Sequence, residues 1–231
     1  MKMLNKKSHF GLAVVLVAAA MVVAGGVVTA SNTGFKMNKP LALPGAGQIG
    51  SNWTSIPYFN PYGNLGAFCT QTGLITSGVA RDTITDIDPV NGAVSTVTCG
   101  TAAATSRAIF PGRGVRIRRP TGQSGSIIIV GSHNPSLSIT VPDAGTGSIG
   151  SLWFSVPYHT TAVTAADLCL SSGLTSTGVS RATIQRLNAS TGAATTVTCG
   201  TAAAGTLNLV LGEAVQIREP NGPLSFIPAH F

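Results

Sequence analysis

The chain has few charged and few aromatic side chains. Only 9% of its 231 residues are Asp, Glu, Lys or Arg, and 6% are Phe, Trp or Tyr. Helical cytosolic proteins carry far more Glu and Lys on their exposed faces, so the composition does not fit that class. Intrinsic disorder does not fit either, because 44% apolar residues suffice to bury a core. The abundance of Gly, Ser and Thr indicates β-structure instead.

Part of the net charge of +7 lies in the N-terminal segment. Three lysines within the first seven residues precede an apolar run over residues 11–28 and then small residues. This order is typical of a secretory signal peptide cleaved after Ala30, the alternative being an uncleaved membrane anchor. Cleavage leaves 11 basic and 7 acidic residues, and a net charge of +4 gives little reason to expect nucleic acid as a partner. We predict a secreted or cell-surface protein, with the periplasm as the other compartment that fits, which would touch a membrane only through an uncleaved signal segment.

The chain contains an internal repeat with a period of 100 residues. Gly47–Val130 and Gly147–His230 are identical at 34 of 84 aligned positions. The preceding segments Leu41–Pro44 and Ile139–Pro142 also match if a gap of two residues is allowed. Units of about 90 residues are small domains rather than solenoid repeats. We predict a signal peptide at 1–30, a leader at 31–40, a first β-repeat domain at 41–130, a linker at 131–138 and a second β-repeat domain at 139–231.

Each repeat alternates polar and apolar residues as β-strands do. Asn91-Gly92 and Asn221-Gly222 are strong turn signals, and Thr164 and Asp167 have the spacing of a helix capping box. The strands expected are 52–58 in the first repeat and 182–188, 194–198, 207–211, 214–218 and 224–227 in the second. We therefore expect a mostly β fold, with two tandem copies of a small antiparallel β-sandwich or partly open barrel, each with one short helix and one disulfide.

The order of these elements resembles a known family. A Trp-x-Ser-x-Pro strand at Trp53, a short helix, a strand-turn-strand and a Leu-Gly-Glu-Ala-Val-Gln-Ile strand at 211–217 follow one another. This series is similar to a small β-domain that recurs, often in tandem, in secreted bacterial surface proteins. The resemblance implies an extracellular β-module and transfers no functional residue.

The four cysteines form two equivalent pairs, one in each repeat. Cys69 and Cys99 are 30 residues apart, as are Cys169 and Cys199 at the matching positions. Because each domain must bring its own pair together, we predict disulfides Cys69–Cys99 and Cys169–Cys199. A zinc site is disfavoured because the spacing is too wide and no His lies near a thiol in the sequence. We expect no metal and no cofactor.

A basic strand in the first repeat is a candidate anion-binding site. It contains Arg113, Arg116, Arg118 and Arg119. On a strand, Arg116 and Arg118 would both point to solvent about 7 Å apart, which suits phosphate, sulfate or uronic acid groups. The alternative, which we favour, is an ordinary solvated strand face.

Other chemical groups give weaker patterns. Trp53 and Trp153 fit either a sugar-stacking platform or, as we favour, buried anchors. Asp82, Asp86 and Asp88 lack the loop Gly and closing Glu of a Ca²⁺ site. A Ser-His-Asp triad could use Asp167 and His133, His159 or His230, but no Gly-x-Ser-x-Gly motif holds a nucleophile.

Three function hypotheses follow. We favour a secreted, non-catalytic structural or adhesive protein, in which Ser31–Ala46 is an unpaired leader that could complete the sheet of a second copy by strand addition. The first alternative is an extracellular binder of anionic polysaccharide through the arginine strand. The second alternative is a secreted hydrolase with an unrecognised site.

Overall fold

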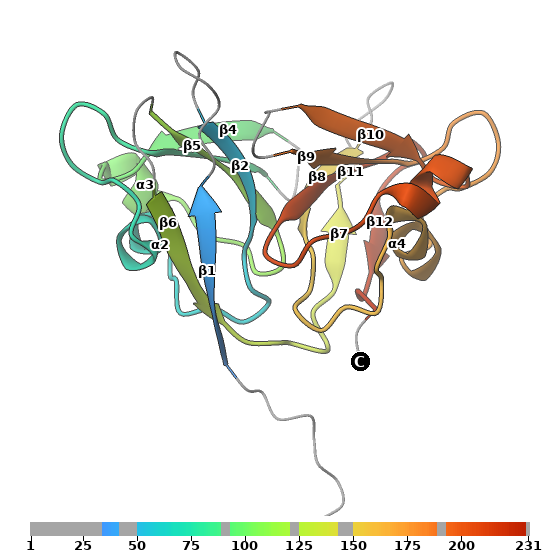
Figure 1. The fold of residues 1–231 in the computed structure, drawn as a ribbon, viewed down its shortest axis with the longest axis horizontal. Coiled ribbons are helices and arrows are strands. Elements are labelled where there is room, and N and C mark those ends of the chain that lie inside the picture. The colour runs from blue at the N-terminus through green and yellow to red at the C-terminus, as the bar shows by residue number, and fades with distance from the viewer. Residues whose placement is uncertain are drawn as a thin grey trace, which may run out of the picture. The chain divides into compact units, whose positions relative to one another are not determined.

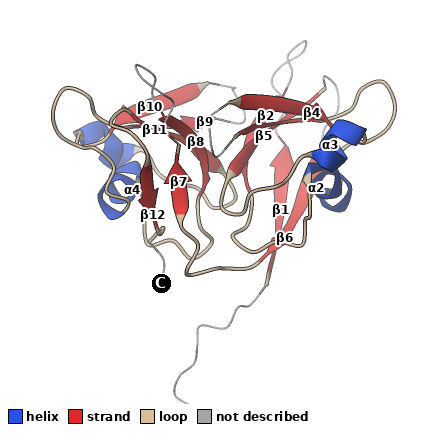
Figure 2. Ribbon diagram, turned by 180° about the vertical axis from the view of Figure 1, so that it is seen from behind, coloured by secondary structure: helices blue, strands red, loops and turns tan. Residues whose placement is uncertain are grey.

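In this computed structural model each repeat folds into a four-stranded and a two-stranded antiparallel sheet, with an apolar core between them (Figure 1). The structure describes residues 34–41, 50–88, 93–120, 125–142, 150–188 and 193–229. Residues 34–231 belong to one compact unit. Strands dominate each repeat, and the helices lie to one side of it (Figure 2).

The first repeat pairs its strands in the order β2-β5-β3-β4, with β1-β6 as the two-stranded sheet. Its elements are β1 (Phe35–Leu41), β2 (Gly50–Ser55), α2 (Leu65–Thr72), β3 (Thr83–Ile87), β4 (Val94–Thr98), α3 (Ala102–Ser106), β5 (Gly114–Arg119) and β6 (Gly125–Gly131).

The second repeat has the same order, β8-β11-β9-β10, with β7-β12 as the two-stranded sheet. Its elements are β7 (Ile139–Val141), β8 (Gly150–Ser155), α4 (Ala165–Ser171), β9 (Thr183–Leu187), β10 (Ala194–Thr198), the 3-10 helix η1 (Ala202–Thr206), β11 (Ala214–Glu219) and β12 (Leu224–Phe226). The common topology confirms the predicted mostly β fold built from two tandem antiparallel β-sandwiches.

The helices follow the sequence signals only in part. The capping box of α4 is present, with the Thr164 hydroxyl accepting from the Asp167 amide and the Asp167 carboxylate accepting from the Thr164 amide. A second short helix, α3 or η1, follows the second cysteine of each repeat and was not predicted. The strand expected at 207–211 forms only an isolated bridge between Asn208 and Thr164. It is excluded from the sheet because its backbone bonds the segment that leads into α4, through Leu209 N–H and the Val163 carbonyl at 2.8 Å.

The segment predicted to be an unpaired leader is instead largely a strand of the first repeat. β1 begins at Phe35 and pairs antiparallel with β6 from Phe35↔Gly131 to Leu41↔Gly125. The rest of the leader, 31–33 and 42–46, lies outside the described residues. Leu41 ends β1 as Val141 ends β7, so the two strands correspond at the period of 100 without the gap. The gap of two residues allowed in the sequence comparison is not needed. It aligned apolar residues equally well because a shift of two keeps every side chain on the same face.

No helix within the described ranges is long and apolar enough to cross a membrane. The apolar run at 11–28 and the turns at Asn91-Gly92 and 191–192 lie outside the described residues. The hairpins that those turns would close are present, because β3 pairs antiparallel with β4 and β9 with β10.

Candidate functional site

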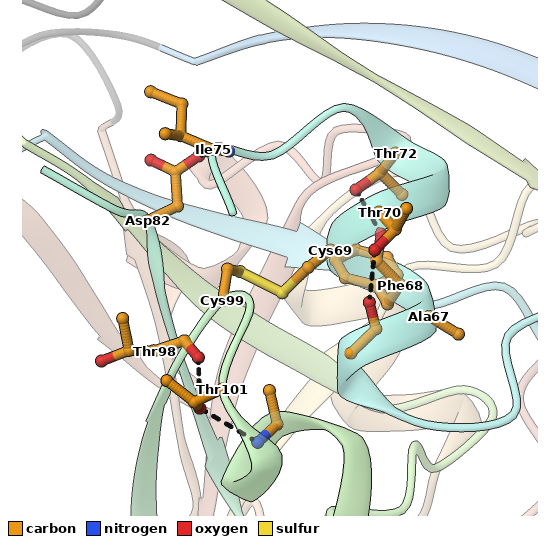
Figure 3. The surroundings of a disulfide bond; sticks show 12 residues. Ala67, Phe68, Cys69, Thr70, Thr72, Ile75, Asp82, Thr98, Cys99 and Thr101 are labelled. Atoms are coloured by element: carbon orange, nitrogen blue, oxygen red, sulfur yellow. Dashed lines mark hydrogen bonds between the residues drawn. A yellow bond between two sulfur atoms is a disulfide. The ribbon is translucent and has the colours of Figure 1, made fainter. Parts of the chain in front are cut away.

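Each repeat is cross-linked as predicted, by Cys69–Cys99 and Cys169–Cys199. Figure 3 shows Cys69 on α2 joined to Cys99, which directly follows β4. Next to the bridge, the Thr101 hydroxyl donates to the Thr98 carbonyl at 2.7 Å and accepts from the Ala104 amide at 3.3 Å. The bridge and this cap hold both short helices against the end of the edge strand.

A buried ion pair, which we did not predict, lies close to the first disulfide. The Arg119 guanidinium donates to the Asp82 carboxylate through Nε at 3.0 Å and Nη2 at 2.7 Å. The side chains are 4% and 0% exposed. Asp82 also accepts from the Ile75 amide at 2.7 Å and so fixes the segment that follows α2 (Figure 3).

In the second repeat the equivalent backbone amide donates to a carboxylate of β11, whereas Asp82 directly precedes β3. Ala182 stands in place of Asp82, and Glu219 stands in place of Arg119. Glu219 accepts from the Thr175 amide at 3.0 Å and from the Thr175 hydroxyl at 2.8 Å. The signal in the sequence is that both positions change together between the repeats, so that each repeat keeps one carboxylate there.

The four predicted anion-binding arginines are not brought together as a free patch. Arg119 is held by Asp82, and Arg113 donates to the Thr140 carbonyl of the second repeat at 2.6 Å. Burial lowers the pKa of the Arg113 guanidinium to about 10, with Asp88 acting in the opposite direction. Arg116 lies over the Trp153 ring, 5.7 Å from its centroid. Arg118 is half-buried, and burial together with the charge of Arg118 lowers the pKa of Arg116.

The two tryptophans are buried, but between the repeats rather than in either sandwich. Trp53 and Trp153 are 8% and 5% exposed, and their ring centroids lie 5.9 Å apart. Ile87, Ala214 and Leu187 complete this cluster. It excludes the sugar-stacking alternative for these rings, because neither presents a face to solvent.

Backbone hydrogen bonds join the repeats reciprocally. The Ser55 amide donates to the Gly212 carbonyl at 3.2 Å, and the Ser155 amide donates to the Gly112 carbonyl at 3.0 Å. The hydroxyls repeat the pattern, with Ser55 donating to the Glu213 carbonyl and Ser155 to the Arg113 carbonyl. Equivalent groups contact each other in both directions, as in the interface of a symmetric dimer. These bonds lie at the last residues of β2 and β8.

Gly112 and Gly212 permit this approach. A Cβ added at Gly112 would lie 2.6 Å from Ile139, and one added at Gly212 would lie 2.3 Å from Met37. Both glycines also have positive φ, at 71° and 79°. Side chains other than hydrogen would therefore push β1 and β7 away from the neighbouring repeat.

A buried lysine lies at the same junction. Lys39 of β1 is 8% exposed and occupies the position of Ile139 in β7. Burial lowers its pKa to about 8; the Glu213 carboxylate raises the pKa and the Arg186 guanidinium lowers it. Glu213 and Arg186 of the second repeat are themselves paired at 2.9 Å.

An aromatic cluster fills the other side of the junction. Phe35 stacks on Tyr158 with centroids 4.6 Å apart, and Tyr158, His159, His133 and Tyr58 follow in edge or stacked contacts. Phe35, Tyr58, His133 and Tyr158 also line a pocket of about 400 Å³, counting the part open to solvent. His133 and His159 thus pack with aromatic rings, and His230 lies outside the described residues.

The remaining acids named from the sequence have structural partners. Asp86 pairs with Arg107 at 3.0 Å, and Asp88 lies 3.9 Å from the same guanidinium. Burial raises the pKa of Asp86, and Arg107 partly opposes it. Asp167 caps α4, and its hydrogen bonds with Thr164 lower its pKa.

These contacts define a class of protein: a duplicated, disulfide-bonded β-sandwich whose repeats share a buried interface. Compared with protein-family models, curated proteins and solved structures, the chain has no match in any of the three. Its function has therefore to follow from the chemistry of its own residues.

Proposed function

We propose that this protein is secreted and acts outside the cell or at its surface as a non-catalytic structural or adhesive element. The observation that carries the proposal is the interface between the repeats. There the tryptophans and Arg113 and Arg116, the groups best suited to hold a ligand, contact the neighbouring repeat instead.

The cross-links support the same proposal. Two disulfides on equivalent positions suit an oxidising compartment outside the cytosol. Each ties a helix to an edge strand, so a force or a protease that opens one edge meets a covalent link. The anionic-polysaccharide alternative is less well supported, because three of its four arginines are engaged within the chain.

The test is deletion of the gene from the producing cells. The proposal predicts a weaker attachment of cells or of their extracellular material, restored by the wild-type chain. It predicts less restoration by Trp53→Ala, which disrupts the interface between the repeats, than by the exposed control Ala103→Ser. Intact attachment together with loss of turnover of a compound in the medium would contradict the proposal and favour the hydrolase.

A further inference from the structure

The outer edges of the two four-stranded sheets are open for pairing. β4 ends the first sheet and β10 ends the second, and no described strand pairs with the outer side of either (Figure 1). The inner edges β2 and β8, in contrast, lie at the interface between the repeats. Each four-stranded sheet thus has one outer edge strand to which no described strand is added.

The direction of the free backbone groups follows from the hydrogen bonds that β4 already makes. The Cys99 amide donates to the Asp82 carbonyl at 2.9 Å, and the Asp88 amide donates to the Ala93 carbonyl at 2.8 Å. Backbone hydrogen bonding alternates along an antiparallel pair, so the amides and carbonyls of the odd-numbered residues of β4 point toward β3. The amides and carbonyls of Val94 and Thr96 therefore point away from the sheet.

The same geometry recurs on β10. The Cys199 amide donates to the Ala182 carbonyl at 2.9 Å, and the Asn188 amide donates to the Ala193 carbonyl at 2.8 Å. The backbone groups of Ala194 and Thr196 then point outward. The two repeats differ in their buried residues, but in both of them the outer edge strand presents its backbone groups in the same way.

Neither edge carries the features that usually prevent strands from associating. Edge strands of monomeric proteins are commonly blocked by Lys, Pro or a bulge. β4 reads Val-Ser-Thr-Val-Thr and β10 reads Ala-Thr-Thr-Val-Thr, without charge or proline. Val94 is 65% exposed. Thr and Val favour strand pairing, so both edges are suited to accept another strand.

We propose that β4 and β10 are self-association surfaces, through which copies of this chain join edge to edge into linear polymers. The partner is a second copy because the repeat already associates with its own duplicate, through side chains on the outer faces of the same sheets. An uncharged edge also selects for an uncharged strand, which each copy supplies twice. With one such edge strand on each four-stranded sheet, the contacts need not close and can form a filament. This inference deepens the proposed function, and its biological role rests on that function. The self-association itself can be measured on the purified chain alone.

The test compares charge insertion on the edges with matched insertion elsewhere. The chain from residue 31, purified in oxidised form, is analysed by sedimentation velocity over a wide concentration range and by negative-stain electron microscopy. The wild type should form polymers that grow with concentration. Thr96→Lys/Thr196→Lys should raise the apparent dissociation constant by about tenfold or more. Ala103→Lys/Ala203→Lys, on exposed helical turns, adds the same charge and should leave polymers intact.

The single variant Thr96→Lys shows which edges meet. Dimers as the end point mean that like edges pair, and monomers mean that β4 pairs with β10; both outcomes support the inference. A wild-type chain that stays monomeric at all concentrations, or equal effects of the two double variants, would overturn it. Either of these results would leave the proposed surface location and the deletion phenotype untouched, so the two proposals fail separately.

Discussion

The buried pair of Asp82 and Arg119 allows a prediction of large effect. Asp82→Ala removes the carboxylate that accepts two hydrogen bonds at 3.0 and 2.7 Å from Arg119 and one at 2.7 Å from the Ile75 amide. The Arg119 side chain is 4% exposed, so water cannot replace the lost partner. Breaking such a pair from one side should lower the free energy of unfolding by about 3–5 kcal/mol.

The second repeat shows which further substitutions should restore the stability lost in Asp82→Ala. There Ala182, Glu219 and Thr175 occupy the positions of Asp82, Arg119 and Ile75. The triple variant Ile75→Thr/Asp82→Ala/Arg119→Glu copies that arrangement into the first repeat and leaves no buried cation. Its stability should return to within about 1 kcal/mol of the wild type.

Guanidinium unfolding and thermal melts of the oxidised chain measure both variants. For a unit of this size, Asp82→Ala should lower the melting temperature by roughly 6–20 °C. A loss below about 1 kcal/mol for Asp82→Ala would refute the burial of an uncompensated charge. A triple variant no more stable than Asp82→Ala would refute the idea that Glu219 with Thr175 and Asp82 with Arg119 are interchangeable arrangements.

Three further substitutions test the junction and the cross-links. Trp153→Ala should cost about 3–5 kcal/mol and separate the calorimetric unfolding of the repeats into two transitions. Lys39 binds its proton more weakly when folded, with a pKa of about 8 against 10.5 unfolded, so stability should rise by about 2 kcal/mol from pH 8 to pH 10. Lys39→Ile, which copies Ile139, should abolish that rise. Cys69→Ser/Cys99→Ser should lower stability by about 3.5 kcal/mol by chain entropy alone.

Each of these three predictions can be contradicted by a specific result. A single transition with little loss in Trp153→Ala would mean that the repeats do not depend on their interface. A free energy of unfolding that is level between pH 8 and pH 10 would place Lys39 in solvent. For the disulfide, Cys169→Ser/Cys199→Ser is the matched variant, and a strong effect in one repeat without the other would contradict equivalent roles.

The topology within each repeat could be predicted because it depends on local signals and on duplication. The capping box at Thr164 predicted α4, and the common spacing of 30 residues predicted both disulfides. Strands β9 and β10 lie where the sequence predicts them, within one residue at each end. The helix at Ala102–Ser106 escaped prediction because its only marks are a Thr cap and three alanines, which occur in loops as readily.

The interface between the repeats could not be predicted, and the candidate sites depend on it. Alternation along β5 correctly places Val115 and Ile117 in the core and Arg116 on the opposite face. It does not say what covers that opposite face, which here is Trp153. The pairing of Arg119 with Asp82, 37 residues away, likewise depends on which strands become neighbours. Long-range packing of this kind leaves no periodic trace in one sequence.

A structural or adhesive role outside the cytosol is tested most directly by fractionation of the producing cells with thiols blocked at lysis. Peptide mapping by mass spectrometry then follows the chain into the cytosolic, membrane, surface and medium fractions. We predict the chain, beginning at Ser31, in the surface or extracellular fraction with Cys69 linked to Cys99 and Cys169 linked to Cys199. Full-length chain in the cytosol with four blocked thiols would contradict it.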